Sequence, residues 1–557
     1  MLETQWFSPY DNQRRIGSVI EVLASQIKIN LTLAGKGIAH FVNGQQLRVG
    51  EINEYIFIDV GATALLGKLT RVWLDGAERL SVEQLNDKEN ENHPTGLVQP
   101  LATVQFSTGK VQRGISQYPR LGAQVYAAHP QLVAWILTNK AEEINSIDLP
   151  LGHATTDETT HIYASPEQLF SRHCAVLGST GSGKSNTVAK LIELVAEHNG
   201  KALLIDATGE YEGIENCESC YVGNKLNPNA AHQQLTFPYW QLMDSDLYAL
   251  LRPSGQVQLP KLIEAIRSLK ALYHCSLQTQ QNYTIFQKAN ADKSAFNSWV
   301  QYVTNDSRWD FNYLAEQIQA ECVYPDANFG KDTSKFGGEN INEYGHCMTL
   351  VGRINAFKNN PHMKWLIVDS SSNAISTISD KIISFMQSDV GILRIDLSAV
   401  PFDANAREIL VNAIGRCLLN NCRSQQITPQ KPLLVFIDEA HQFISKSVGD
   451  DANKFSLDAF GNIAKEGRKY GLNVVISTQR PRDVPEDVLS QIGTFFVHRL
   501  TNPYDQELVK RSIGDLDQNA ALSLPTLGTG EALLLGTDFN FSMRLKIKQA
   551  RKTPESE

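Results

Sequence analysis

The sequence has no apolar run of about 20 residues, the length that a helix needs to cross a bilayer. Its first residues, Met1-Leu-Glu-Thr, lack the features of a secretory signal peptide. Cysteine is also scarce: there are eight in 557 residues, and Cys174 and Cys417 lie inside apolar patterns, as reduced cysteines usually do. These absences argue against a membrane-spanning protein and a disulfide-rich secreted domain. They predict a cytoplasmic protein that contacts no membrane.

Little in the sequence resembles a zinc site. Cys217 and Cys220 have the spacing of metal ligands, but no second cysteine pair follows them. Only His274-Cys275 and His346-Cys347 are available to complete such a site. We therefore favour a solvent-facing loop with two free thiols over a zinc centre here.

An excess of positive charge is absent as well. The 51 Lys and Arg residues are outnumbered by 60 Asp and Glu, and the net charge of −9 argues against a generally basic surface for nucleic acid. The net charge does not exclude a locally basic channel, because phosphate contacts need only a few well-placed lysines and arginines. At 557 residues the chain is too long for one core, so two or three domains are expected.

The first 152 residues are predicted to form a small β-barrel domain. Short runs with alternating or fully apolar character follow one another, with no long helical pattern between them. Such close spacing is typical of a small closed barrel. The predicted strands cover residues 16–22, 26–31, 55–60, 65–73 and 132–137.

Residues 153–548 show strands that alternate with helices, the pattern of an α/β domain with a parallel sheet. Between about 215 and 385 the sequence is mostly polar and helical, which predicts a helical insertion in that domain. Residues 549–557 are polar and are expected to form an extended or disordered tail. The predicted core strands cover residues 173–178, 201–206, 391–397, 432–438, 472–478, 494–500, 531–535 and 543–548.

A complete phosphate-binding loop lies between the first of these core strands and a helical pattern. Glycines let the backbone curl so that its N–H groups point at phosphates, with help from the helix N-terminus. Lys184 is then expected to reach the β- and γ-phosphates, and the Ser185 hydroxyl to bind Mg²⁺. We therefore predict that the chain binds ATP and Mg²⁺. The predicted nucleotide-binding residues are Gly178, Ser179, Thr180, Gly181, Ser182, Gly183, Lys184, Ser185 and Asn186.

A second catalytic element follows the strand at 432–438. That apolar strand ends in two acids, Asp438 and Glu439. In ATPases with such a loop the first acid holds Mg²⁺ through its water shell, and the second polarises the attacking water as a general base. The pattern predicts these roles for the two residues.

Three further residues are catalytic candidates. Gln479 ends the next strand, and because the carboxyl ends of parallel strands line one crevice, we expect it beside the γ-phosphate rather than as a simple strand cap. Arg172 and Arg468 are candidates to stabilise charge in the transition state, either in their own subunit or in a neighbouring one. The alternative for each arginine is a surface salt bridge.

These motifs together resemble the HerA family of hexameric DNA-translocating ATPases. The resemblance extends over nearly the whole chain, through Ile205-Asp-Ala-Thr-Gly-Glu-Tyr, Phe436-Ile-Asp-Glu-Ala-His, Glu466-Gly-Arg-Lys-Tyr-Gly, Ser477-Thr-Gln-Arg-Pro, His498-Arg-Leu-Thr-Asn-Pro-Tyr-Asp and Gly530-Glu-Ala-Leu-Leu-Leu-Gly. It implies a RecA-like ATPase core behind an N-terminal HAS barrel. One departure is Ala207-Thr208, where many members carry Pro-His, so no role can be transferred to that histidine.

The resemblance also implies an assembly and partners. It implies a homohexamer with ATP sites at subunit boundaries and double-stranded DNA in the central pore. Asp206 and Glu210 would face the active site or the neighbouring subunit. A nuclease, a sirtuin-like protein or another effector would dock on the barrel face. Lys446 and Lys454 are candidates for DNA contact in the pore, or are simply solvated.

Three functions therefore compete. The first is an ATP-driven DNA translocase or helicase that works with a separate nuclease or effector, in DNA end processing or anti-phage defence. The second is a hexameric scaffold that uses ATP as a switch to assemble and activate a partner. A peptide-secreting ATPase of the same superfamily is disfavoured by the missing membrane segment and by the predicted barrel.

Overall fold

The computed structural model describes residues 8–31, 40–42, 45–47, 50–74, 93–138, 148–155, 157–226, 228–279, 284–301, 303, 308–368, 375–425, 432–444, 446–449, 454–512, 518–552 and 554. The chain divides into two compact units. Met1–Lys190 and Ile492–Arg551 form the first unit, and Leu191–Gln491 with Lys552–Glu557 forms the second.

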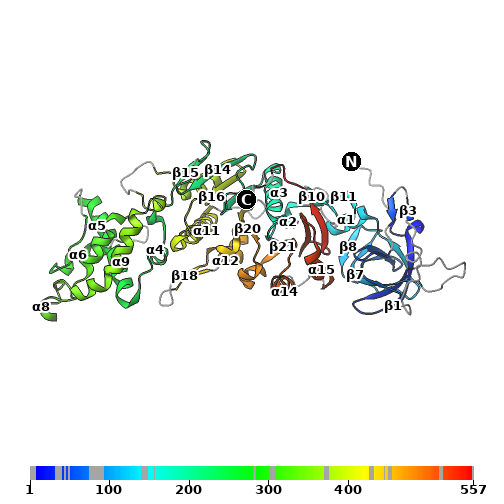
Figure 1. Cartoon of the computed structure of the whole chain (residues 1–557), viewed down its shortest axis with the longest axis horizontal. Coiled ribbons are helices and arrows are strands. Elements are labelled where there is room, and N and C mark those ends of the chain that lie inside the picture. Colours follow the sequence, from blue (N-terminus) through cyan, green and yellow to red (C-terminus); the bar gives the residue numbers. More distant parts are fainter. Residues whose placement is uncertain are drawn as a thin grey trace. The chain divides into compact units, whose positions relative to one another are not determined.

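The first unit begins with a closed barrel of six strands (Figure 1). The barrel strands are hydrogen-bonded in the order β2-β1-β9-β5-β6-β7, and the antiparallel pairing of β2 with β7 closes the barrel. A further strand, β8, pairs with β7. The six barrel strands are β1 (Arg15–Val22), β2 (Ile27–Leu31), β5 (Tyr55–Asp59), β6 (Ala64–Trp73), β7 (Thr95–Gln105) and β9 (Gln124–Ala127), and the seventh strand of this sheet is β8 (Lys110–Arg113). A separate hairpin joins β3 (His40–Val42) and β4 (Gln45–Leu47).

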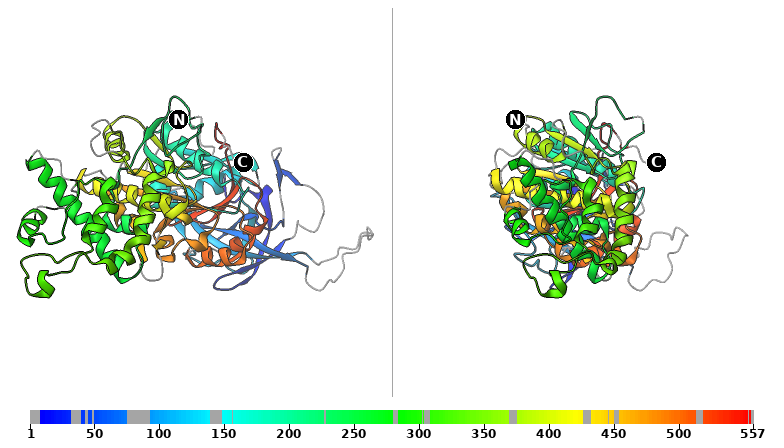
Figure 2. Two further views of the ribbon diagram at one scale, coloured as in Figure 1. Left: turned by 60° about the vertical axis from the view of Figure 1, so that its left-hand side comes forward. Right: turned by 90° about the vertical axis from the view of Figure 1, so that its left-hand side faces the viewer.

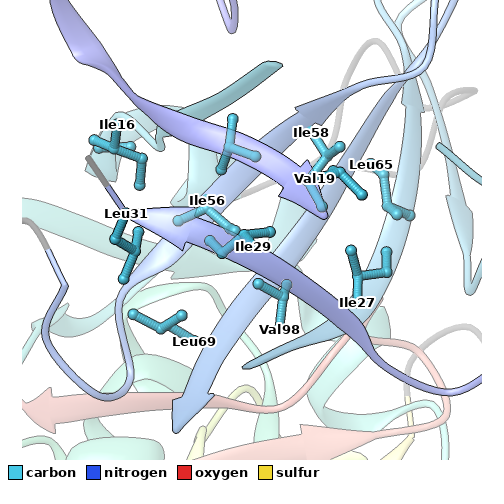
Figure 3. Packing of buried hydrophobic residues seen from close by; sticks show 12 residues of the cluster. Ile16, Val19, Ile27, Ile29, Leu31, Ile56, Ile58, Leu65, Leu69 and Val98 are labelled. Atoms are coloured by element: carbon cyan, nitrogen blue, oxygen red, sulfur yellow. The ribbon is translucent and has the colours of Figure 1, made fainter. Parts of the chain in front are cut away.

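Alternation of side chains builds the barrel interior. Ile27, Ile29 and Leu31 of β2 are buried, while the residues between them are half-buried, so one face of the strand points inward. Figure 3 shows these side chains meeting Ile56 and Val98 from other strands. Aliphatic side chains therefore fill the barrel, and the prediction of a barrel is confirmed.

One predicted barrel strand is wrong. Residues 132–137 lie in a helix, α1 (Pro130–Thr138). A short apolar run fits a buried helix as well as a strand, because it has no polar residues to reveal a period. Pro130 opens the helix at its first position, where the missing N–H costs nothing.

The rest of the first unit is a sheet in the order β11-β10-β23-β22-β21-β12. Only the β12–β21 pair is parallel, and the other neighbours are antiparallel. Its strands are β10 (Leu149–Ala154), β11 (Asp157–Ala164), β12 (His173–Leu177), β21 (Ile492–Val497), β22 (Glu531–Gly536) and β23 (Met543–Ile547). Its helices are α2 (Pro166–Phe170), α14 (Pro503–Ser512) and α15 (Gln518–Ser523), and α3 (Lys184–Glu197) continues into the second unit.

The second unit contains a fully parallel sheet in the order β20-β17-β13-β16-β14-β15. Nearly every residue of its central strands is buried, as expected for a parallel sheet covered on both faces. The strands are β13 (Lys201–Asp206), β14 (Cys217–Val222), β15 (Gln233–Leu235), β16 (Ile392–Asp396), β17 (Leu433–Ile437) and β20 (Leu472–Thr478). The helices α11 (Ala406–Gln425), α12 (Ala459–Glu466) and α13 (Glu486–Leu489) and the hairpin β18 (Lys446–Gly449) with β19 (Lys454–Leu457) complete this part.

Helices dominate the chain between β15 and β16, drawn in green in Figure 2. α5, α7 and α9 pack against one another. The helices are α4 (Asp244–Leu251), α5 (Gly255–Thr279), α6 (Lys293–Val300), α7 (Leu314–Glu321), α8 (Ala327–Gly330), α9 (Ile341–Asn359) and α10 (Ile378–Gln387). Helices thus make up most of the predicted insertion at 215–385, but its first part contains β14 and β15, which the sequence did not reveal.

Candidate functional site

The phosphate loop, residues 178–183, connects the buried strand β12 to helix α3. Gly181 and Gly183 have φ values of +70° and +107°, which residues with a Cβ rarely adopt. A side chain on Gly178 would come within 2.6 Å of Cβ of His498. The loop therefore needs glycine at these positions for its shape, apart from any contact with phosphate.

Hydrogen bonds hold this loop in place. The N–H and hydroxyl groups of Ser179 donate to the carbonyl oxygen of Arg499 at 2.9 and 2.8 Å. Ser182 donates its hydroxyl to the carbonyl of Ser179 at 2.7 Å, and its own carbonyl accepts the N–H of Gly530 at 2.8 Å. Nζ of Lys184 donates to the same Ser179 carbonyl at 3.1 Å. The lysine ammonium is thus held over the loop that precedes it, where phosphate oxygens would compete for it.

Asn186 lies in the first turn of α3, and its side chain binds protein. Its Oδ1 accepts the N–H of Ala550 at 2.9 Å, and its Nδ2 donates to the carbonyl of Lys548 at 3.4 Å. The predicted nucleotide-binding residue therefore anchors the segment after β23. We refer to residues 173–187, together with His498 and Gly530, as the phosphate region.

The predicted acids meet in the second unit, at the carboxyl ends of its parallel strands. In register, Ile205 pairs with Ile437 and Ile437 pairs with Ile476, so the residues after them lie side by side. Nε2 of Gln479 donates to Oε1 of Glu439 at 2.7 Å. Glu439 itself has a left-handed backbone, with φ 48° and ψ 42°. We call these strand ends, with the residues that contact them, the acid region.

His441 is a residue of the acid region that the sequence analysis did not single out. Its Nδ1 lies 3.1 Å from Oε2 of Glu439 and 3.2 Å from Oγ1 of Thr478. Gln479 therefore donates to one oxygen of the Glu439 carboxylate, and His441 lies beside the other oxygen, Oε2, without a hydrogen bond to it. Its signals in the sequence were its place two residues after the predicted base and at the end of the motif Phe436-Ile-Asp-Glu-Ala-His.

The buried Asp438 carboxyl lies close to other carboxylates. Burial raises its pKa to about 7, and the nearby carboxylates of Glu439, Asp206 and Glu210 act in the same direction. A hydrogen bond with Ser477 lowers the pKa, but by less. Among the described residues, no group of three or more His, Cys, Asp or Glu side chains is arranged to hold a metal by itself. A carboxylate oxygen is a ligand type that Mg²⁺ prefers, so Asp438 could supply one ligand to such an ion.

A buried ionic chain supports the acid region. Oδ2 of Asp206 accepts from Nε of Arg394 at 2.7 Å, and both side chains are fully buried. Nη2 of Arg394 also lies 3.4 Å from Oδ2 of Asp396, which accepts from Nζ of Lys225 at 2.6 Å. Burial raises the pKa of Asp396, but hydrogen bonds from Lys225 and Ser398 outweigh burial and leave the pKa below its usual value. Neither Arg394 nor Lys225 was predicted from the sequence.

The second oxygen of Asp206 organises the following loop, because Oδ1 accepts the N–H of Gly209 at 2.8 Å. Asp206 is fully buried, whereas Glu210 is half-buried. Both carboxylates contribute to the raised pKa of Asp438. Asp206 therefore acts on the acid region from inside the protein.

Both candidate arginines are exposed and lie at the amino ends of their strands. Arg172 precedes β12, whereas the phosphate loop follows it. At about 3.3 Å per residue, β12 separates Arg172 from the loop by roughly 16 Å. Arg468 lies in the short helix before β20, and by the same rise the seven residues of β20 span roughly 23 Å towards Gln479 at the other end. Neither arginine therefore approaches the functional residues at the far end of its own strand.

The remaining candidates lie elsewhere. Cys217 and Cys220 lie on strand β14, which pairs with β16, and Cys220 is fully buried. The expectation of a solvent-facing loop at these cysteines is therefore wrong, because β14 adds to the edge of the parallel sheet. Lys454 is exposed on the β18–β19 hairpin, and the side chain of Lys446 lies outside the described part of the structure.

The fold and the phosphate loop define a P-loop ATPase. A model of the central domain of helicase HerA matches residues 149–414, and a model of the helicase HerA-like C-terminal domain matches residues 425–540. Together the two matches span more than half of the 557 residues. The chain belongs to the HerA family.

Individual relatives share about a quarter of their aligned residues with this chain. A probable DNA double-strand break repair helicase HerA of Methanocaldococcus jannaschii is 26% identical over 407 residues, 72% of this chain and 76% of that protein. The DNA double-strand break repair helicase HerA of Pyrococcus furiosus is 24% identical over 480 residues, 84% of this chain and 80% of that protein. Among solved structures, the bacterial conjugative coupling protein TrwB with sulphate is 14% identical, with a TM-score of 0.45 over 77% of this chain and 94% of that chain.

Membrane insertion finds no support in the helices. Within the ranges that the structure describes, none combines the length and the apolar character needed to span a bilayer.

Proposed function

We propose that this chain is an ATP-driven motor that moves double-stranded DNA. Two observations support the proposal: the chain belongs to a family of which curated relatives are named DNA double-strand break repair helicases, and its sequence contains the residues predicted to bind ATP and to activate water, Lys184, Asp438 and Glu439. The observation that carries most weight is the position of Glu439. Its carboxylate follows a buried strand and accepts a hydrogen bond from Gln479 through Oε1, while Oε2 has no hydrogen-bond partner among the described residues, as a general base for water requires.

The roles of the residues follow from their chemistry. In this proposal the glycine-shaped loop and Lys184 bind the β- and γ-phosphates of ATP, and Ser185 and Asp438 hold Mg²⁺. The metal ion, when bound, neutralises the charge that develops on the phosphate oxygens. Glu439 accepts a proton from the attacking water, and Gln479 orients the carboxylate that does so.

We further propose a homohexamer in which an arginine from one subunit completes the site of the next. The positions of Arg172 and Arg468 support this, because each is exposed at the strand end opposite to the functional residues of its own strand. A ring also repeats any pore-facing lysine, such as Lys454, six times. An acidic chain can therefore form a basic channel that contacts DNA phosphates without reading sequence.

Mixed rings would test the arginines. R468A and E439Q are each expected to be inactive alone, because each ring then lacks one essential group at every site. In a mixed ring, an R468A subunit beside an E439Q subunit has its own Glu439 and receives Arg468 from its neighbour. Recovery of ATP hydrolysis on mixing supports action in trans, and no recovery contradicts it. The same design applies to R172A.

The motor is tested first by the ATP hydrolysis rate with and without linear duplex DNA. We expect duplex DNA to raise the rate, and the gain to fall steeply with salt, because counterions compete for DNA phosphates. A rate that DNA leaves unchanged would contradict the motor and favour an ATP-regulated scaffold for a partner nuclease or other effector on the barrel face. In the same proposal, the partner acts with this chain in DNA end processing or in anti-phage defence.

A further inference from the structure

His498 lies against the start of the phosphate loop. It follows β21 directly, and its N–H donates to the carbonyl of Leu177, the last residue of β12, at 2.7 Å. Its Cβ occupies the space next to Gly178, where an added Cβ would approach to 2.6 Å. The parallel pairing of β12 and β21 therefore ends on this histidine, and the loop turns away from it.

The imidazole also contacts the other end of the loop. Nε2 of His498 and Oγ1 of Thr187 are hydrogen-bonded at 2.9 Å, and Thr187 is buried in the first turn of α3. Cε1 of the ring lies 3.7 Å from the position that a Cβ on Gly183 would take. His498 thus connects the residue before the loop, through its backbone N–H, with the helix after the loop, through its imidazole.

The histidine is uncharged at neutral pH. Complete burial lowers its pKa to about 4, and the nearby Lys184 ammonium adds to this effect against opposing backbone hydrogen bonds. A neutral ring has one donor and one acceptor nitrogen, so it can bond Thr187 without bringing a second cation close to Lys184. The positive charge available to phosphate then comes from Lys184 and the helix N-terminus.

We propose that His498 is a positioning residue for nucleotide binding: bonded to Thr187 and packed on Gly178, it fixes both ends of the phosphate loop in the shape that accepts a triphosphate. This inference rests on ATP binding by the loop and not on DNA movement. A binding measurement without DNA therefore tests it independently of the motor.

The test compares paired variants in the full-length protein, with a non-hydrolysable ATP analogue and Mg²⁺ as the probe. T187V removes the hydroxyl with little change in volume, whereas T187S keeps it. H498N cannot reach Thr187, whereas the amide of H498Q extends to about the position of Nε2. We expect T187V and H498N to raise the Kd about fivefold, the value of one internal hydrogen bond. T187S and H498Q are expected to stay within twofold of the wild type.

Steady-state kinetics of ATP hydrolysis distinguishes a distorted phosphate loop from general destabilisation of the fold. The phosphate loop contacts the triphosphate in both the ground and transition states, so distortion of the loop weakens both alike. T187V is therefore expected to raise KM for ATP about fivefold and to leave kcat within twofold.

T494V is the matched control. Thr494 is also buried on β21, and its hydroxyl donates to the carbonyl of Gln168 at 2.8 Å, outside the phosphate region. This variant loses one hydrogen bond of a buried threonine hydroxyl, whereas T187V loses the bond to His498 and a longer one, 3.3 Å, to the carbonyl of Gly183. T494V should bind the analogue as the wild type does. Unchanged affinity in T187V and H498N would overturn the proposal, as would equal losses in T187V and T494V. Equal losses in H498N and H498Q would assign the histidine to packing alone.

Discussion

The phosphate region and the acid region are built in opposite ways. The phosphate region is shaped by glycines and by hydrogen bonds between neutral groups, with Lys184 as its central charge. The acid region collects buried charges: Asp206, Arg394 and Asp396 form a chain of ion pairs next to Asp438. A loop made of backbone can present N–H groups to an anion, whereas a cluster of carboxylates is suited to a cation and to water.

This difference predicts which property of the protein changes when each region is mutated. Substitutions in the phosphate region should alter nucleotide affinity and leave the fold nearly intact. Substitutions in the acid region should abolish hydrolysis or unfold the unit, because a buried charge without its partner is costly. The predictions below challenge this contrast, from the largest expected effect to the smallest.

The largest effect is expected from Glu439→Gln. Loss of the general base should lower kcat about 10³-fold, within the range for proton transfer to a positioned group, while ATP binding is retained. Lys184→Ala should instead weaken ATP binding. Rapid-quench hydrolysis and equilibrium binding on both variants would check the contrast. Normal turnover by E439Q would show that another group activates water.

Arg394→Met should destabilise the second unit by about 3–5 kcal/mol, because it leaves the buried carboxylates of Asp206 and Asp396 without their shared partner. Lys465→Ala is the control, since it removes an exposed pair with Asp487 and should cost less than about 1 kcal/mol. Denaturant unfolding would measure both. Equal, small losses would mean that the ionic chain contributes little to stability.

His498 gives the phosphate region a pH dependence of its own. Its pKa is near 4 in the folded chain and 6.5 ordinarily, so between these values the unfolded chain binds more protons and stability falls as the pH falls. From pH 7.5 to 5 the loss should be about 2 kcal/mol. H498Q should lack this loss, and the difference between the two unfolding curves is the measurement. Parallel curves would mean that the histidine is already protonated at pH 5.

The smallest effect is expected from Asn186→Ala. Removing the amide that accepts the N–H of Ala550 should speed hydrogen exchange at Ala550 about fivefold, the value of one hydrogen bond. Exchange in β12 should not change. Mass spectrometry of peptides covering residues 546–552 would read this, and unchanged exchange would show that the segment after β23 is held by other contacts.

The sequence predicted the contiguous parts of the site and not the long-range parts. The phosphate loop, Asp438-Glu439 and most core strands could be read because each is a local pattern. Arg394 could not, since a charged residue inside an apolar strand does not reveal a partner 188 residues away in the chain. Lys225 pairs with Asp396 over a similar separation of 171 residues. β14 and β15 were missed because both are short and neither has a clear apolar period.

The claim that the ATPase drives DNA movement is tested most directly by displacement of streptavidin from the end of a biotinylated linear duplex. The wild-type protein should remove the streptavidin when ATP and Mg²⁺ are present. E439Q should leave it in place while still binding ATP. Hydrolysis of ATP on this DNA by the wild type, with no streptavidin released, would contradict the account.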